Sequence, residues 1–206
     1  MEFDKIDWIA VDWGTTNFRA WFIKNDKVIK KVIKPKGIKN VLKKNFENTL
    51  INNLKIPKKI PNRILIISCG MIGSKQGWYD TGYTNNLIVK KNNLIKVNTK
   101  NKKIFFYIVK GLLQKKPYDV IRGEETQVLG YLNYDKKFSG FICLPGTHSK
   151  WIKVIGGKVI KFKTFMTGEI FEIITNNSIL KHDIKEDNIN LKVFKNSILK
   201  SQKRNF

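Results

Sequence analysis

The residues near the start of the chain that are best suited to chemistry form a polar stretch, Asp12-Trp13-Gly14-Thr15-Thr16. Gly14 has no Cβ, so the backbone there can approach a bulky anion closely. Thr15 and Thr16 offer hydroxyl and N–H donors to phosphate oxygens, and Asp12 can hold Mg²⁺, mostly through water. Such a turn suits a nucleoside triphosphate. The alternative is a β-hairpin in which these residues only form the turn.

A second candidate group is Arg122-Gly123 followed by the paired carboxylates Glu124 and Glu125. Acidic residues are favoured by the dipole in the first turn of a helix, which gives the pair a purely structural explanation. In the functional interpretation, one glutamate takes a proton from a substrate hydroxyl, and the other orients the substrate or holds metal-bound water. Arg122 then suits a carboxylate on the substrate, because a guanidinium binds carboxylates bidentately.

A second glycine–threonine turn, Gly146-Thr147-His148, separates two strand-like segments over residues 138–144 and 151–155. It repeats the order strand, Gly-Thr turn, strand of the opening stretch. Two such turns can grip a phosphate chain from opposite sides, which is more specific than either turn alone. His148 either donates a hydrogen bond to phosphate or is an ordinary turn residue.

A glycine-rich stretch, residues 69–78, follows an apolar run and completes the candidate site. Loops at the carboxyl ends of buried strands are where α/β proteins place ligands. Gly73 fits a loop with unusual dihedral angles, and Trp78 suits the wall of a sugar-sized pocket. The alternative is a structural loop that is closed by an aromatic side chain.

The elements that position these groups indicate a mixed α/β fold, with an antiparallel meander, a helix and then buried strands. A loop is expected from the end of the strand at 104–109 through Pro117. Strands are predicted over residues 6–12, 18–24, 27–34, 63–68, 104–109, 138–144, 151–155 and 158–165. Helices are predicted over 38–55, from 124, from 166 and over 184–201.

Composition excludes several classes of protein. The 206 residues are 42% apolar, which allows a core and excludes wholesale disorder. The net charge of +24 comes mainly from lysines that are scattered along the whole chain, without an Arg-rich arm, zinc-finger spacing or an aromatic–basic RNA-binding pattern. We therefore expect only non-specific binding of polyanions at low salt.

The sequence has no apolar run of membrane-span length, and its first residues include Glu2, Asp4 and Asp7 in place of a basic leader. A cytoplasmic protein without a membrane partner is expected. Cys69 and Cys143 are far apart and belong to no CxxC or Cys/His cluster, so we expect two buried thiols and no disulfide or zinc site.

Five blocks between about Ile9 and about Leu180 resemble the 2-dehydro-3-deoxygalactonokinase family: DWGTTNFRAW, CGMIGSKQGW, VIRGEETQVLG, LPGTHSKW and FMTGE. This resemblance implies an α/β fold of the sugar kinase, Hsp70 and actin superfold, an actin-like or ribonuclease H-like ATPase lobe with a mixed sheet flanked by helices. It implies phosphorylation of 2-dehydro-3-deoxy-D-galactonate to its 6-phosphate with ATP and Mg²⁺, in sugar-acid breakdown.

The matched blocks also imply roles in an in-line phosphoryl transfer. Asp12 is the magnesium-side and catalytic carboxylate, and Glu124 is the preferred base with Glu125 second. Arg19 and Arg122 are the candidates for the sugar-acid carboxylate. The remaining candidates are the phosphate-binding residues Gly14, Thr15, Thr16, Gly146, Thr147 and His148, and the substrate-binding residues Gly73 and Trp78.

The sequence departs from the family pattern after residue 180. Kinases of this fold have two lobes that close on the nucleotide. Residues 1–180 are interpreted as the N-terminal lobe and 181–206 as the start of a second lobe, without a later glycine-containing loop for the purine. We expect weak ATP affinity, an exposed apolar face and little activity, unless self-association or a second polypeptide completes the chain.

Two alternatives come from other classes. VIRGEETQVLGYL also resembles the acidic helix start of exopolyphosphatases, which would use a glutamate to activate water. The second turn argues against this family, since it reads Pro-Gly-Thr-His and lacks the Asp-x-Gly-Gly-Gly-Ser of that family. The other alternative is a non-catalytic, polyanion-binding remnant of a kinase. The stereoisomer of the sugar acid and the choice between the two glutamates stay open.

Overall fold

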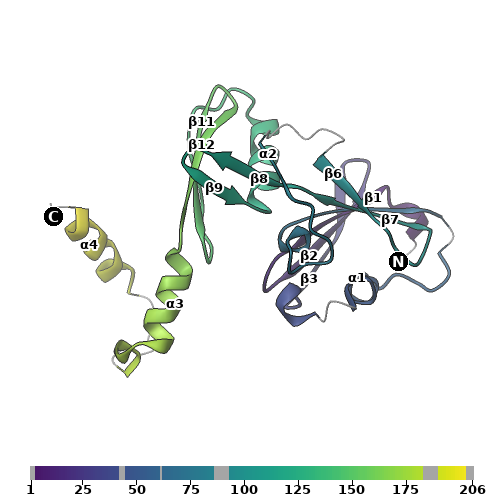
Figure 1. The fold of residues 1–206 in the computed structure, drawn as a ribbon, viewed down its shortest axis with the longest axis horizontal. Coiled ribbons are helices and arrows are strands. Elements are labelled where there is room, and N and C mark those ends of the chain that lie inside the picture. The colour runs from purple at the N-terminus through teal and green to yellow at the C-terminus, as the bar shows by residue number, and fades with distance from the viewer. Residues whose placement is uncertain (1–2, 42–44, 61, 86–92, 183–189, 203–206) are drawn as a thin grey trace.

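A six-stranded mixed sheet forms the larger part of the computed structural model, which describes residues 3–41, 45–60, 62–85, 93–182 and 190–202 (Figure 1). Its strand order is β3-β2-β1-β4-β7-β6. The strands are β1 (Trp8–Trp13), β2 (Phe18–Lys24), β3 (Lys27–Lys34), β4 (Ile64–Cys69), β6 (Leu94–Val97) and β7 (Ile104–Val109). The predicted meander of β1 to β3 is confirmed.

The pairing of β1 with β4 is parallel, and it places Asp12 opposite Cys69. The carboxyl ends of these two strands therefore meet at one edge of the sheet, where α/β proteins place their ligands. β7 pairs with β4 in the same direction. The chemistry-bearing residues at the ends of β1 and β4 are thus neighbours because of strand direction, although they are far apart in the sequence.

The core beneath this sheet is built by the alternation of side chains along β1. Ile9, Val11 and Trp13 face inward and are almost completely buried. Helix α1 (Phe46–Leu54) covers this face with Phe46 and Leu50. The ring of Trp13 meets the ring of Phe46 edge to face at 5.9 Å, and its indole N–H donates to the carbonyl of Lys36 at 3.0 Å.

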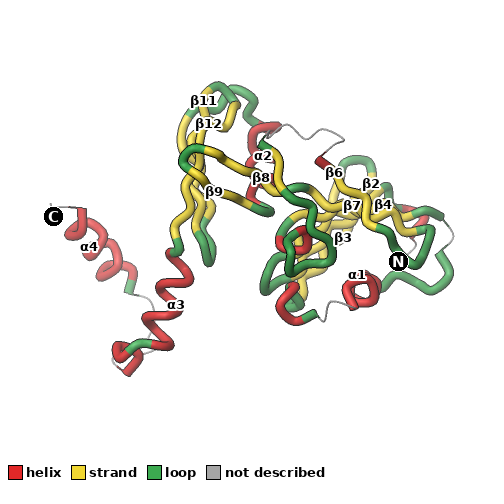
Figure 2. Tube along the Cα trace, in the orientation of Figure 1, coloured by secondary structure: helices red, strands yellow, loops and turns green. Residues whose placement is uncertain are grey.

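A second group of strands follows in the chain (Figure 2). One sheet has the order β5-β8-β9 and another the order β10-β11-β12. Helix α2 (Glu124–Tyr134) packs against them through a separate apolar cluster that includes Val128, Leu132, Ile152 and Val154. The strands are β5 (Tyr83–Thr84), β8 (Gly111–Lys115), β9 (Tyr118–Ile121), β10 (Gly140–Leu144), β11 (Ser149–Ile155) and β12 (Lys158–Phe165).

Helices α3 (Thr167–Asn177) and α4 (Leu191–Gln202) extend away from these sheets (Figure 1). None of the eleven residues of α3, all of which the structure describes, is buried. Large apolar side chains are exposed on both helices: Ile170, Phe171, Ile173, Ile174, Leu191, Val193, Phe194, Ile198 and Leu199. Short 3-10 helices occupy Phe3–Lys5, Ile38–Asn40, Met71–Gly73 and Ile179–His182.

The predicted helix over residues 38–55 is wrong at its start. Residues Ile38–Asn40 form a 3-10 helix, Val41 is extended, and α1 begins only at Phe46. The cause is a set of hydrogen bonds to the first glycine–threonine turn. The N–H groups of Gly37, Ile38 and Lys39 donate to the carbonyls of Thr16, Gly14 and Thr15, at 2.7, 3.0 and 3.2 Å.

Two smaller predictions are also corrected. The loop predicted before Pro117 contains β8, which pairs with β9 because Leu112 and Ile121 both face the second apolar cluster. Cys143 is exposed and Cys69 is half-buried, so the two thiols are not both buried. Part of the helix predicted over 184–201 lies outside the described residues, and α4 accounts for the rest. No helix in the described ranges is long and apolar enough to span a membrane.

Candidate active site

Two glycines bring the first turn, the glycine-rich loop and the start of α2 into direct contact. Gly70 and Gly123 both have positive φ, 93° and 102°, which favours glycine. A Cβ on Gly70 would lie 2.8 Å from the carbonyl oxygen of Trp13 and 3.1 Å from a carboxylate oxygen of Asp12. A Cβ on Gly123 would lie 3.1 Å from the Cα of Gly70. The sequence-predicted groups at Asp12 and at the paired glutamates are therefore brought together.

The first turn, residues 14–17, is shaped so that its donors are available. The N–H of Gly14 donates to the carbonyl of Asn17 at 3.0 Å and closes the turn. The carbonyls of Thr15 and Thr16 are occupied by the N–H groups of residues 37–39. Both threonines are exposed, and their hydroxyls make no hydrogen bond within the part of the chain that the structure describes. This arrangement fits the phosphate-binding role that the sequence predicts.

Asp12 is half-buried, and its Oδ2 accepts a hydrogen bond from Arg19 at 2.9 Å. This ion pair partly neutralises Arg19, one of the two predicted partners of a sugar-acid carboxylate. Within the described ranges, no three His, Cys, Asp or Glu side chains gather as a metal cage. A single accessible carboxylate beside a phosphate-binding turn fits Mg²⁺, which keeps much of its water and takes its other ligands from phosphates.

The two glutamates at the start of α2 have different environments. Oε2 of Glu124 accepts from the backbone N–H of Arg122 at 3.0 Å, and its side chain is 24% exposed. Glu125 is only 3% exposed, and its carboxylate accepts from the N–H of Gly123 at 2.5 Å and from the hydroxyl of Thr126 at 3.1 Å. Glu124 is therefore accessible to a substrate hydroxyl, whereas Glu125 satisfies backbone donors within the fold.

Burial raises the pKa of Glu125 to about 7, although hydrogen bonds from the backbone N–H groups of Glu125 and Gly123 oppose the change. Burial also raises the pKa of the nearby Cys69 thiol, and the charges of Asp12 and Glu125 add to this effect. The Cys69 thiol is therefore protonated at neutral pH and is a poor nucleophile.

The raised pKa of Glu125 predicts a pH-dependent stability. The folded chain binds this proton more tightly than the unfolded chain, so the contribution of Glu125 to stability is fully present at low pH and is lost as the pH rises from about 4.5 through about 7. The loss across this window is about 3 kcal/mol for the single group. We expect Glu125→Gln to abolish this decline when urea-unfolding free energies are measured from pH 4.5 to 8. The prediction is wrong if the unfolding free energy of Glu125→Gln falls with pH as steeply as that of the wild type and of the exposed control Glu172→Gln.

Arg122 is a buried cation that lacks a carboxylate partner among the described residues. Its guanidinium donates to the hydroxyl of Thr81 at 2.9 Å and to the carbonyl of Gly82 at 3.0 Å, and its Cζ lies 4.5 Å from the ring centroid of Tyr83. Nε is buried without a partner in the described part of the chain. Gly73 makes room for it, since a Cβ there would lie 2.8 Å from a guanidinium nitrogen.

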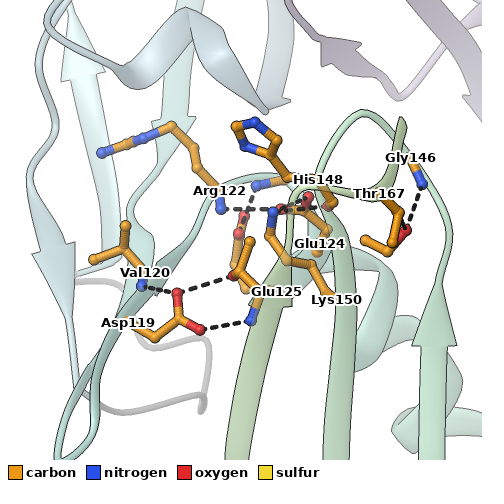
Figure 3. A network of polar contacts seen from close by, with 12 residues as sticks. Asp119, Val120, Arg122, Glu124, Glu125, Gly146, His148, Lys150 and Thr167 are labelled. Atoms are coloured by element: carbon orange, nitrogen blue, oxygen red, sulfur yellow. Dashed lines mark hydrogen bonds and ion pairs between the residues drawn. The ribbon is translucent and has the colours of Figure 1, made fainter. Parts of the chain in front are cut away.

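The second turn, residues 146–148, is exposed and docks onto the start of α3. The ring of His148 bonds to the carboxylate of Glu169, whose N–H donates to the carbonyl of Thr147 at 3.0 Å. Gly168 permits this close approach, because a Cβ there would lie 2.6 Å from the carbonyl oxygen of Gly146. Figure 3 shows His148 and Lys150 near Glu124, the first residue of α2.

Trp78 lies apart from these groups. Its ring stacks on the ring of Phe106 at 4.8 Å and on that of Phe46 at 6.4 Å, within the apolar cluster of the large sheet. These contacts are those of an aromatic residue that closes the loop, and a role of Trp78 in sugar binding stays a prediction.

Sequence reasoning missed two side chains of this site, Lys150 and Glu169. Glu169 is the partner of His148, and Lys150 is a buried lysine 3.6 Å from Glu124. Lys150 had a detectable signal, because it shares the inward-facing alternation of Ile152 and Val154 along β11. A charged residue at an inward-facing position of a strand is unusual and indicates a specific partner.

Comparisons with known proteins agree on one family. Residues 12–205 match the model of the 2-keto-3-deoxy-galactonokinase family. The chain is 37% identical over 183 residues to the "Probable 2-dehydro-3-deoxygalactonokinase DgoK1" of Rhizobium meliloti (strain 1021). It is 28% identical over 177 residues to the 2-dehydro-3-deoxygalactonokinase of Escherichia coli (strain K12). These matches span 86% and 84% of this chain but only 59% and 58% of the two relatives.

A crystal structure of a 2-dehydro-3-deoxygalactonokinase protein from Sinorhizobium meliloti superposes with a TM-score of 0.77 at 36% identity. The match covers 88% of this chain and 60% of that one. It confirms the predicted fold class, an actin-like α/β lobe with a mixed sheet flanked by helices.

Proposed function

The chain belongs to the 2-keto-3-deoxy-galactonokinase family, and we propose that it binds ATP and transfers its terminal phosphoryl group to 2-dehydro-3-deoxy-D-galactonate, giving the 6-phosphate. The observation that carries the proposal is the contact of Gly123 with Gly70 and of Gly70 with Asp12. This contact supports the proposal, because it joins the start of α2, which carries the accessible carboxylate of Glu124, to Asp12 at the end of β1. Phosphoryl transfer needs that combination, a group that accepts the hydroxyl proton next to the site that holds the phosphates.

The roles of the chain's own residues follow from their exposure and contacts. Thr15 and Thr16 of the first turn and Thr147 of the second supply hydroxyl and N–H donors to phosphate oxygens. Glu124 takes the proton from the attacking hydroxyl of the sugar acid. Asp12 would hold Mg²⁺, which neutralises charge on the phosphates when bound. Because the proposed phosphoryl donor is ATP, we propose that the reaction takes place in the cytoplasm.

Arg122 is the proposed partner of the sugar-acid carboxylate, in preference to Arg19. Arg19 is already paired with Asp12, whereas the guanidinium of Arg122 keeps an unused N–H donor and forms no ion pair with a carboxylate among the described residues. A buried guanidinium gains from a carboxylate, because the ligand's negative charge offsets its desolvation. This choice also explains Gly73, whose missing Cβ leaves room for the guanidinium.

The proposed role of Arg122 can be tested through the KM for the sugar acid. Arg122→Met keeps an apolar side chain of similar length, and we expect it to raise the KM for the sugar acid by roughly 10- to 100-fold, the loss of a charged hydrogen-bonded pair. The KM for ATP should change little. Coupled ADP-release kinetics measure both constants, with the exposed Arg63→Met as the matched control. An unchanged KM for the sugar acid in Arg122→Met would remove Arg122 from the substrate site.

We also propose that α3 and α4 pack against a partner, which is either a second copy of this chain or a second polypeptide. Apolar side chains on both helices are 40% or more exposed, from Ile174 at 40% to Phe171 at 69%. Contiguous apolar surface of this kind marks an interaction site. The relatives contain a further segment, since the chain spans 59% of the length of the Rhizobium meliloti protein.

A further inference from the structure

Lys150 is a charged residue in a row of apolar side chains. Lys150, Ile152 and Val154 alternate on the inward face of β11, and the last two pack in the cluster that contains Val128 and Leu132 of α2. The side chain of Lys150 is only 8% exposed. A buried ammonium group destabilises a fold unless polar partners compensate for the lost water.

The partners of this ammonium belong to two different parts of the site (Figure 3). Nζ of Lys150 donates to the carbonyl of His148 in the second turn at 2.9 Å. The same atom lies 3.6 Å from Oε1 of Glu124, the first residue of α2. The other carboxylate oxygen of Glu124 accepts from the N–H of Arg122 at 3.0 Å. Glu124 is therefore fixed by a backbone donor on one oxygen and faces the ammonium with the other.

We propose that Lys150 is a positioning residue that holds the carboxylate of Glu124 and the second turn, residues 146–148, at a fixed separation. The inference deepens the proposed kinase function and rests on it for its catalytic consequence. A general base contributes fully only when it is oriented toward the proton that it accepts, and small displacements of such groups lower rates strongly. One buried cation that contacts both segments fixes their relative position more directly than either segment's own backbone.

The test distinguishes the effect of the Lys150 ammonium group from the effect of the aliphatic part of its side chain. Lys150→Met keeps the apolar stem and removes the charge, and Lys150→Arg keeps a cation. Lys161→Met, at an exposed position of β12, is the matched control. Amide hydrogen exchange is read for peptides that cover residues 122–126 and 145–149, and kcat and KM are read in the coupled ADP-release assay.

We expect Lys150→Met to accelerate exchange in both peptides by about tenfold, because the buried contacts that restrain them are lost. Exchange in β1 and β4 of the large sheet should stay at the wild-type rate. We expect kcat to fall by about tenfold or more while the KM for the sugar acid is kept, since the substrate's carboxylate partner is elsewhere. Lys150→Arg should restore part of both effects.

Wild-type exchange in both peptides of Lys150→Met would overturn the proposal, as would equal effects in the Lys161→Met control. Accelerated exchange spread evenly over the whole chain would also overturn it, because it would indicate general destabilisation and no local restraint. The exchange readout does not depend on turnover. If the wild-type chain shows no sugar-acid phosphorylation, the proposed kinase activity of this chain by itself fails, and the exchange data still decide whether Lys150 holds the two segments together.

Discussion

Glu124→Gln is expected to lower kcat by about 10²- to 10⁴-fold, the usual contribution of a general base. Glutamine has nearly the same shape and can still accept the N–H of Arg122, but it cannot take a proton from the sugar-acid hydroxyl. The KM for ATP should be nearly unchanged, because the two turns, and not Glu124, are the proposed phosphate-binding elements. Steady-state kinetics of ADP release measure this effect directly.

The control for this variant is Glu172→Gln, at an exposed position of α3 outside the site. It removes the same charge and should leave both kinetic constants at the wild-type level. Wild-type kcat in Glu124→Gln would transfer the role of base to another group. The first candidate would then be Glu125, although it is 3% exposed and bonded to the backbone of Gly123.

Gly37→Ala is expected to disrupt the first turn and to remove ATP binding. An added Cβ would lie 2.2 Å from the carbonyl oxygen of Thr15 and 2.4 Å from the carbonyl carbon of Thr16, so the backbone must move. Overpacking of this kind costs about 1–3 kcal/mol of stability or more. The affected atoms are those of the proposed phosphate site, so calorimetric titration with MgATP should show no heat of binding, and urea unfolding should show the lost stability.

Gly130→Ala provides the contrast for this prediction. Gly130 lies within α2, and nothing approaches the position of an added Cβ within 4 Å. We expect that variant to be neutral or more stable by up to about 1 kcal/mol, because alanine favours a helix more than glycine does. ATP binding by Gly37→Ala at the wild-type affinity would show that the contact between residues 37–39 and the first turn does not matter for the site.

Local patterns in the sequence were sufficient to predict five of the six strands of the large sheet, all except β6, and the hairpin from β11 into β12. The alternation along Trp8–Trp13 and the continuous apolar run of Ile64–Cys69 reflect burial, which depends on nearby residue types. The prediction of a helix that begins at Ile38 was wrong because of hydrogen bonds between residues far apart in the sequence. The N–H groups of residues 37–39 bond to carbonyls of the first turn, and periodicity carries no information about such bonds.

For the candidate site, the sequence located several residues but could not rank them. The blocks located Asp12, Glu124 and Arg122, which the fold brings to one end of the sheets. The sequence could not distinguish Glu124 from Glu125, because their difference is one of burial, nor Arg19 from Arg122, because their difference is the ion pair with Asp12. Lys150 was missed because its contact with Glu124 joins two elements that are distant in the sequence.

Phosphorus-31 NMR of ATP, Mg²⁺ and 2-dehydro-3-deoxygalactonate with the purified chain tests the central claim most directly, over a series of protein concentrations that permits self-association. The proposed kinase function predicts a new phosphomonoester resonance that grows as the terminal phosphate of ATP disappears, that requires the sugar acid and that is absent in Glu124→Gln. Inorganic phosphate that forms at the same rate with and without the sugar acid would contradict it, because the acceptor would then be water and the site would be that of a phosphohydrolase.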